Sequence, residues 1–133
     1  MALHQEPQKV VEKAYLVAIP VPSLDISGSP LDRGEIDKWV KKALNELTEC
    51  FGGAMPMAAP GTNMLEGQIL YEKDQVVVVS ACDSREEFLQ KRSRIEAFAK
   101  EMRRDLRQHS VFVLACPSDS FLVEISSRPE GSP

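Results

Sequence analysis

The stretch QVVVVSAC, residues 75–82, decides the fold. Four consecutive β-branched valines disfavour a helix, because such side chains lose rotamer freedom against the preceding helical turn. They suit a strand, whose successive side chains point to opposite faces. Since the run is apolar at every valine position, both faces of this strand need to be covered. We therefore expect it to be a central strand of a sheet.

Other segments predict further strands. Residues 14–19 and 111–116 are also apolar throughout, so we expect both faces of these strands to be covered as well. Residues 64–71 are typical of a strand that a turn at 72–74 connects to the valine strand as a hairpin. A shorter apolar run at 121–125 predicts an extra strand, which a Pro-Ser turn separates from the preceding one.

Two segments have the periodicity of helices. Residues 32–51 place apolar side chains on one helical face, and Gly52 and Gly53 form a typical helix stop. Residues 84–109 begin with Ser84 and a glutamate at the spacing of a capping box. The apolar stripes are Ile36, Trp39, Val40, Ala43, Leu44 and Leu47 in the first segment, and Phe88, Leu89, Ile95, Phe98, Ala99, Met102 and Leu106 in the second.

The order of these elements predicts the fold class. Strand, helix, strand, strand, helix and strand follow one another, with the extra strand at the end. We expect an α+β fold, a ferredoxin-like β-α-β-β-α-β sandwich with an extra C-terminal strand, in which two helices cover one face of an antiparallel sheet. Residues 1–13 should form a polar N-terminal arm, residues 14–125 a single α+β domain and residues 126–133 a disordered tail.

Length and composition are those of an ordinary globular protein. The 133 residues, with 27% charged residues and a net charge of −4, fit one domain. The charge gives no general attraction to nucleic acid or to anionic membranes, and no apolar run approaches the ~20 residues needed to span a bilayer. The first residues lack the features of a signal peptide. We expect a cytoplasmic protein without nucleic-acid or membrane partners.

The sequence carries no recognisable catalytic or metal-binding motif. Cys50, Cys82 and Cys116 are an odd number without a CxxC pair, which argues against a disulfide framework and a zinc site. In the expected fold, Cys82 and Cys116 end strands that run in opposite directions, so they should lie at opposite edges. His4 in the polar arm and His109 near a helix end do not suit a catalytic triad. We predict no catalytic residue, no metal and no cofactor.

The second face of the sheet lacks an obvious cover. Two helices cover one face, whereas three of the expected strands are apolar on both, and monomeric proteins seldom expose such a patch. We expect a homodimer packed sheet to sheet, with Val76 and Val78 or their neighbours Val77 and Val79 in the interface. Alternatively, a methionine-rich loop at 54–63 folds across the face, or another protein partner covers it.

Glu66 is the best candidate for ligand binding. It shares one face of its expected strand with Gln68, and a glutamate on the covered side would be a polar group in an apolar cavity. We predict small-ligand contacts at Glu66, Gln68, Met55 and Met57, whereas Glu72 should lie in a solvated turn. The resulting hypothesis is a non-catalytic binding or interaction module.

The alternative hypothesis is a small enzyme of the dimeric-barrel kind, oxygenase-like or isomerase-like. Its substrate would lie in a pocket between the sheet and the loops at 21–31 and 54–63. Loss of turnover on substitution of Glu66, or a ligand that purifies with the protein, would favour this class. The sequence does not exclude this enzyme, but it favours the non-catalytic module.

Three short segments resemble those of small uncharacterised bacterial proteins. The segments are Phe51-Gly-Gly-Ala, the run from Glu66-Gly-Gln to Glu72, and Gln108-His-Ser-Val-Phe-Val. In the pattern of those proteins a Phe-Gly-Gly turn precedes a Gly-x-Trp strand, and this chain has Ile69 at the place of the tryptophan. The resemblance spans residues 14–116, and it implies a ferredoxin-like fold and no activity.

Overall fold

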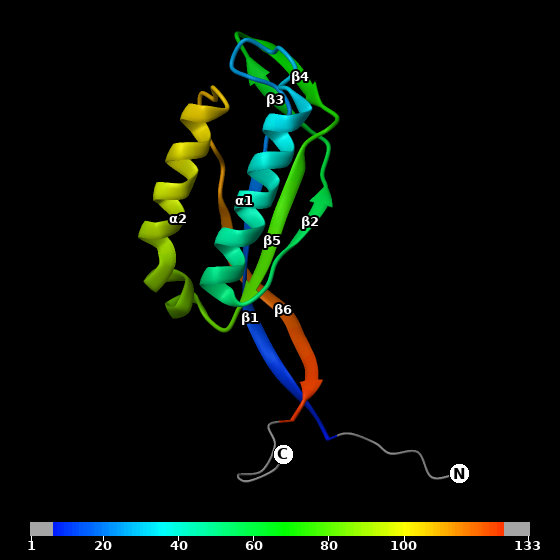
Figure 1. Ribbon diagram of the computed structural model, residues 1–133, viewed down its shortest axis with the longest axis vertical. Helices are drawn as coiled ribbons and strands as arrows, with labels where there is room; N and C mark the ends of the chain where they lie inside the picture. Colours follow the sequence, from blue (N-terminus) through cyan, green and yellow to red (C-terminus); the bar gives the residue numbers. More distant parts are fainter. Residues whose placement is uncertain (1–6, 127–133) are drawn as a thin grey trace, which may run out of the picture.

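The computed structural model describes residues 7–126. Strands β2, β5, β1 and β6 form one sheet in this order with antiparallel neighbours, and β3 and β4 form a separate hairpin. Figure 1 shows α1 and α2 side by side on one face of the sheet. The elements are β1 (Gln8–Val21), α1 (Arg33–Phe51), β2 (Met55–Ala58), β3 (Gly61–Leu65), β4 (Gln68–Glu72), β5 (Val76–Cys82), α2 (Arg85–Asp105) and β6 (Leu114–Ile125).

The core lies between the two helices and the sheet. Trp39 of α1 packs edge-on against Phe98 of α2, with ring centroids 5.5 Å apart, and Tyr15 of β1 lies against Phe88 of α2. The predicted α+β class, with two helices packed on an antiparallel sheet, is confirmed. The buried side chains include Val17, Ile19 and Val21 of β1, Val78 and Cys82 of β5, Ile36, Ala43 and Leu47 of α1, and Ile95 and Met102 of α2.

The long strands β1 and β6 extend beyond the helices. Their pairing begins with Gln8 opposite Ile125, so residues 8–13 form part of a strand instead of the predicted polar arm. This part of the sheet is a two-stranded ribbon, made of residues 8–13 and 120–125, which projects away from the helices (Figure 1). We call it the β1–β6 ribbon. Residues 1–6 of the predicted arm and residues 127–133 of the predicted tail lie outside the described residues.

β6 also replaces two predicted elements. The expected turn at 117–120 and the expected extra strand at 121–125 are both parts of this one strand. The register of β6 against β1 shifts between Lys13 and Tyr15, which is a β-bulge. A bulge accommodates an additional residue in a continuing strand, so the polar residues here bend β6 without ending it.

The predicted strand at 64–71 is a tight hairpin in the structure. Glu66 and Gly67 both have positive φ, at 49° and 78°, between the paired residues Leu65 and Gln68. Two central residues with positive φ are typical of the type I′ turn, whose twist matches that of the flanking strands. The strand that pairs with the outer side of β5 is β2, in the segment predicted as an irregular loop at 54–63.

The two strand-end cysteines are placed differently from the prediction. Because β5 and β6 are both antiparallel to β1, they run in the same direction. Cys82 lies opposite Tyr15 and Cys116 opposite Leu16, so the two thiols are at the same level of the sheet and on opposite faces. Both are free.

Candidate functional site

The sheet has one face without helices, which we call the open face. Three rows of paired residues cross it. Opposed residues of antiparallel strands share a face, so each row consists of residues on neighbouring strands whose side chains all point to the open face. Every residue of the three rows is apolar: Met57, Val77 and Pro20; Met55, Val79, Ala18 and Leu114; and Ala81, Leu16 and Cys116.

The rim of this face is well exposed. Met55 and Met57 on the edge strand β2 are 60% and 48% exposed, and Leu114 on the opposite edge is 40% exposed. Ala18 in the middle is buried by its neighbours. The methionine-rich segment therefore forms one edge of the face and does not fold across it, which excludes the predicted alternative for residues 54–63.

The valines of β5 divide between the two faces. Val78 is fully buried under the helices, and Val76 pairs with the buried Val21 of the same side. Val77 and Val79 pair with Met57 and Met55 on the open face. Of the four predicted interface residues, only Val77 and Val79 therefore lie where a partner could reach them.

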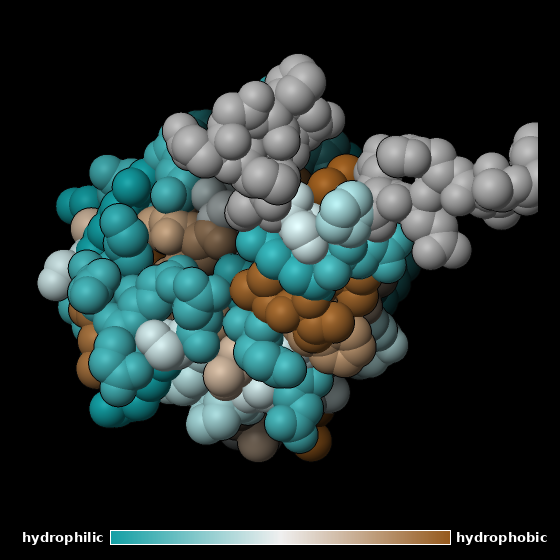
Figure 2. All heavy atoms as spheres, turned by 90° about the horizontal axis from the view of Figure 1, so that it is seen from below, coloured by the Kyte–Doolittle hydropathy of each residue, from teal (hydrophilic) through white to brown (hydrophobic). Residues whose placement is uncertain are grey.

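The β1–β6 ribbon continues the open face. Along β1 the side chains alternate, so Val10 lies on the same side as Leu16 and Ala18. Its partner Val123 shares this side, with Phe121 and Ile125 two residues away along β6. These four ribbon side chains are about 60% exposed, and Figure 2 shows apolar surface gathered at this end of the molecule.

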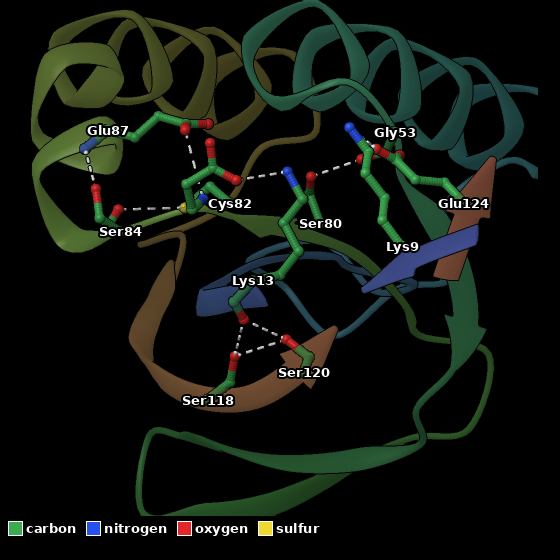
Figure 3. A network of polar contacts seen from close by, with 11 residues as sticks. Lys9, Lys13, Gly53, Ser80, Cys82, Ser84, Glu87, Ser118, Ser120 and Glu124 are labelled. Carbon is green, nitrogen blue, oxygen red and sulfur yellow. Dashed lines mark hydrogen bonds and ion pairs between the residues drawn. The ribbon is translucent and has the colours of Figure 1, made fainter. Parts of the chain in front are cut away.

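A polar cluster fixes the ribbon to the body of the sheet (Figure 3). The carbonyl oxygen of Lys13 accepts hydrogen bonds from the hydroxyls of Ser118 and Ser120, at 3.1 and 2.5 Å. The ammonium of Lys13 lies 2.7 Å from a carboxylate oxygen of Asp83, just after β5. The hydrogen bond between them raises the pKa of Lys13 and lowers that of Asp83. The bulge is therefore held on both sides of β1.

A pocket of about 490 Å³ lies beside the hairpin β3–β4. Two other segments close it, namely the loop between β1 and α1 and the residues that follow α2. We call it the hairpin pocket. It is lined by Leu24, Asp25, Ile26, Asn63, Met64, Leu65, Glu66, Leu70, Glu72, Gln108, His109 and Ser110.

Glu72 joins two walls of this pocket. The prediction of a solvated turn is wrong, because the side chain is 7% exposed. Its Oε1 atom accepts hydrogen bonds from the backbone N–H groups of Ser23 and Leu24, each at 3.0 Å. Two main-chain donors on one carboxylate oxygen fix its position and compensate for its burial. The loop between β1 and α1 is thereby held on the hairpin.

The other walls of the pocket are also bonded to one another. The Gln108 side chain donates to the carbonyl oxygen of Leu24 at 2.7 Å, and the Ile26 N–H donates to the carbonyl oxygen of Arg107 at 2.8 Å. Gly28 has a φ of 84°, and a Cβ there would lie 3.4 Å from the Leu70 side chain. Glycine thus allows the loop to pack closely on the hairpin, and the pocket is preformed.

The four predicted ligand contacts do not converge on one site. Glu66 lines the hairpin pocket from the turn, and Gln68 is an exposed residue at the start of β4. Met55 and Met57 lie on the open face. Sequence reasoning missed Glu72 as a buried residue, and its burial depends on contacts 48 and 49 residues away along the chain.

The buried thiols are not activated. Burial raises the pKa of Cys82 to about 11 and also raises that of Cys50, so both hold their protons at neutral pH. Within residues 7–126, no group of three or more His, Cys, Asp or Glu side chains could hold a metal ion. No helix of the described part of the chain is long and apolar enough to cross a membrane.

Comparison with known proteins finds similarity in structure but not in sequence. No family model and no curated protein sequence matches the chain significantly. A phage SAM lyase in complex with S-methyl-5'-thioadenosine matches with a TM-score of 0.59 and 21% identity, over 94% of this chain and 97% of that chain. The phage SAM lyase in its apo state matches with a TM-score of 0.56 and 23% identity, over 88% of this chain and 93% of that chain.

A weaker likeness is found to CutA from Synechococcus elongatus PCC7942. Its TM-score is 0.47 at 11% identity, over 88% of this chain and 86% of that chain. That score is too low to support an inference. The lyase structures share the fold of this chain, and their low identity does not carry an activity across.

Proposed function

We propose that this chain is a binding or interaction module that self-associates through the open face of its sheet. The observation that carries the proposal is the composition of that face, whose three cross-strand rows are apolar at all ten positions without a charged side chain. Exposed apolar patches of this extent on soluble proteins mark interaction sites. The partner we propose is a second copy of the chain.

The size of the face supports a second copy as the partner. The three rows span about five residues on strands about 4.8 Å apart, so the four strands present roughly 300 Å². The ribbon extends this surface toward the ~800 Å² that each partner contributes to a standard interface, and adds one charged side chain to it, Glu12, opposite Phe121. A two-fold interface brings the same patch together from both copies. Contact between the rows alone would bury no charged side chain.

The ferredoxin-like pattern and the homodimer are parts of this proposal. The strand order β2-β5-β1-β6, with α1 and α2 on one face, supports the ferredoxin-like assignment. In that arrangement the helix-free face is available to a second sheet, and two sheets pack face to face at about 10 Å.

Solution mass tests the proposal. Light scattering over a concentration series should give a dimer for the parent chain and a folded monomer for Val79→Asp. Leu89→Asp is the matched control, because Leu89 is an apolar residue on α2 that is 41% exposed; this variant should remain a dimer. A parent chain that is monomeric at all concentrations would refute the proposal, as would a Val79→Asp variant with unchanged mass.

A second candidate function is that of a small enzyme acting on S-adenosylmethionine. The observation that suggests it is the fold shared with a phage SAM lyase over 94% of the chain, at 21% identity. Incubation of the protein with S-adenosylmethionine, followed by chromatography and mass spectrometry, would detect S-methyl-5'-thioadenosine as a product. Formation no faster than in a protein-free control would exclude this candidate. The result is independent of the solution mass.

A further inference from the structure

We infer that the hairpin pocket binds a small organic cation, with the carboxylate of Glu72 as its anchor. The inference is independent of self-association, because the pocket lies at the end of the sheet that carries the hairpin, and its lining residues do not include the rows of the open face.

The first observation is the free oxygen of Glu72. Its Oε1 atom takes all three hydrogen bonds of the side chain, from the N–H and hydroxyl of Ser23 and from the N–H of Leu24. Among the described residues, no fully buried side-chain oxygen lacks a hydrogen-bond partner. The Oε2 atom has no hydrogen-bond partner among these residues, so it is not fully buried. Glu72 is 7% exposed and lines the pocket, and one of its carboxylate oxygens can therefore accept a further hydrogen bond.

The second observation is the charge of the lining. Asp25, Glu66 and Glu72 are acidic, and neither a lysine nor an arginine belongs to the lining. Arg107, next to Gln108 in the sequence, is paired with the Glu35 carboxylate at 3.1 and 3.2 Å. The pKa of Asp25 is lowered mainly by the hydrogen bond from the Ser27 hydroxyl and also by the charge of Arg107. This arginine therefore partly compensates Asp25, whereas Glu66 and Glu72 keep the excess negative charge. An excess of carboxylates in a concave site with partly apolar walls favours a cationic ligand over a neutral or anionic one.

The three carboxylates of the pocket differ in their ability to bind a cation. The Oδ1 atom of Asp25 accepts bonds from the Ser27 N–H and hydroxyl and from the Ser29 N–H, so Asp25 shapes its own loop. Glu66 is exposed in the turn of the hairpin and contributes long-range attraction. Only Glu72 combines burial, a fixed position and a free oxygen, which are the properties of an anchor.

The remaining lining sets the class of ligand. Leu24, Ile26, Leu65 and Leu70 give the pocket an apolar side, and Asn63, Gln108, His109 and Ser110 add uncharged polar groups or an imidazole to the lining. A volume of about 490 Å³ is within the range of small-molecule sites. The ligand would therefore carry an ammonium or similar cationic group next to Glu72 and an apolar or aromatic body against the leucines.

Matched amines and alcohols test the inference. NMR spectra of the methyl groups would be recorded with tryptamine and tyramine, and with tryptophol and tyrosol, which have the same skeletons without the amine. The two amines should shift the methyl resonances of Leu24, Leu65 and Leu70, and the alcohols should not. Absence of shifts with both amines, or equal shifts with the alcohols, would overturn the inference.

Glu72→Gln separates the anchor from the shape of the pocket. The amide oxygen of glutamine can still accept the bonds from Ser23 and Leu24, so the loop stays in place while the charge is lost. We expect at least tenfold weaker amine binding in this variant. Glu86→Gln removes an exposed charge on α2 and should bind amines like the parent. Unchanged amine binding in a folded Glu72→Gln variant would refute the role of Glu72.

Discussion

Met55 of β2 lies directly opposite Val79 of β5, and both side chains face away from the helices. An edge strand that was expected to be an irregular loop thus widens the apolar face by one strand. Met55 is 60% exposed in a single copy, so it contributes little to the stability of that copy. Its exposure makes it a direct probe of self-association.

Met55→Lys should weaken self-association by at least tenfold. Burial of a methionine side chain stabilises a contact by roughly 1.5–3 kcal/mol, and a lysine in an apolar interface adds a desolvation cost. The dissociation constant, measured by sedimentation equilibrium, checks this. Met64→Lys is the control, because Met64 is equally exposed, at 63%, on β3 outside the open face. Equal dissociation constants for the two variants would contradict self-association through the open face.

Val78→Ala and Val77→Ala should have different effects. Val78 is fully buried under the helices, so truncation should lower the free energy of unfolding by about 2 kcal/mol. Val77 lies on the open face, and its truncation should have a smaller effect on a single copy. Urea unfolding in the Val79→Asp background measures this without a contribution from self-association. A larger loss of unfolding free energy for Val77→Ala than for Val78→Ala would contradict the assignment of Val78 to the face under the helices.

The two helix N-termini also differ. The Ser84 hydroxyl accepts a hydrogen bond from the Glu87 N–H at 3.2 Å, whereas Asp32, at the start of α1, makes no side-chain cap hydrogen bond. Ser84→Ala should therefore lower the free energy of unfolding by about 1 kcal/mol. Asp32→Ala should change it by less, because no cap bond is lost. Chemical denaturation of both variants tests the difference, and equal losses would argue against it.

Trp39 reports the titration of Asp105. The indole N–H of Trp39 donates to the Asp105 carboxylate at 2.5 Å, and this bond is the main reason why the pKa of Asp105 is lowered. Because the folded pKa lies below the unfolded one, the stabilisation is fully present above the unfolded value of about 3.9. It is lost as the pH falls through the folded value.

Fluorescence can follow this titration, because Trp39 is the single tryptophan of the chain. The emission should change with a midpoint below the ordinary aspartate pKa of about 3.9, while circular dichroism shows a folded protein. Asp105→Asn should remove this step. A midpoint at or above the ordinary value, or a step that persists in Asp105→Asn, would contradict the assigned hydrogen bond.

The sequence allowed prediction of the layers, since these depend on local patterns. The valine run indicated a strand with two covered faces, and the apolar stripes indicated two helices on one side. Which valines face the helices depends on the register of β5 against β1, where Val78 lies opposite Ile19. Such a register is set by pairing between distant segments, which alternation alone cannot fix.

The errors at the hairpin have a physical cause as well. Residues 64–71 have a strand-like composition on both sides of Glu66 and Gly67. Gly67 is therefore the main sequence signal for the turn. The burial of Glu72 depends on Ser23 and Leu24 folding over the hairpin, a contact that no local pattern encodes. The hairpin pocket could therefore be found only once the loop between β1 and α1 was placed.

The reactivity of Cys116 reports whether a second copy covers the open face. Cys116 belongs to the open face, opposite Leu16, whereas Cys50 and Cys82 are buried and their raised pKa values keep both thiols protonated. A thiol reagent such as Ellman's reagent therefore reports on the open face. We predict that Cys116 reacts more slowly as the protein concentration rises, and that Val79→Asp reacts fast at every concentration. A parent protein whose Cys116 reacts as fast as in Val79→Asp at all concentrations would contradict self-association through this face.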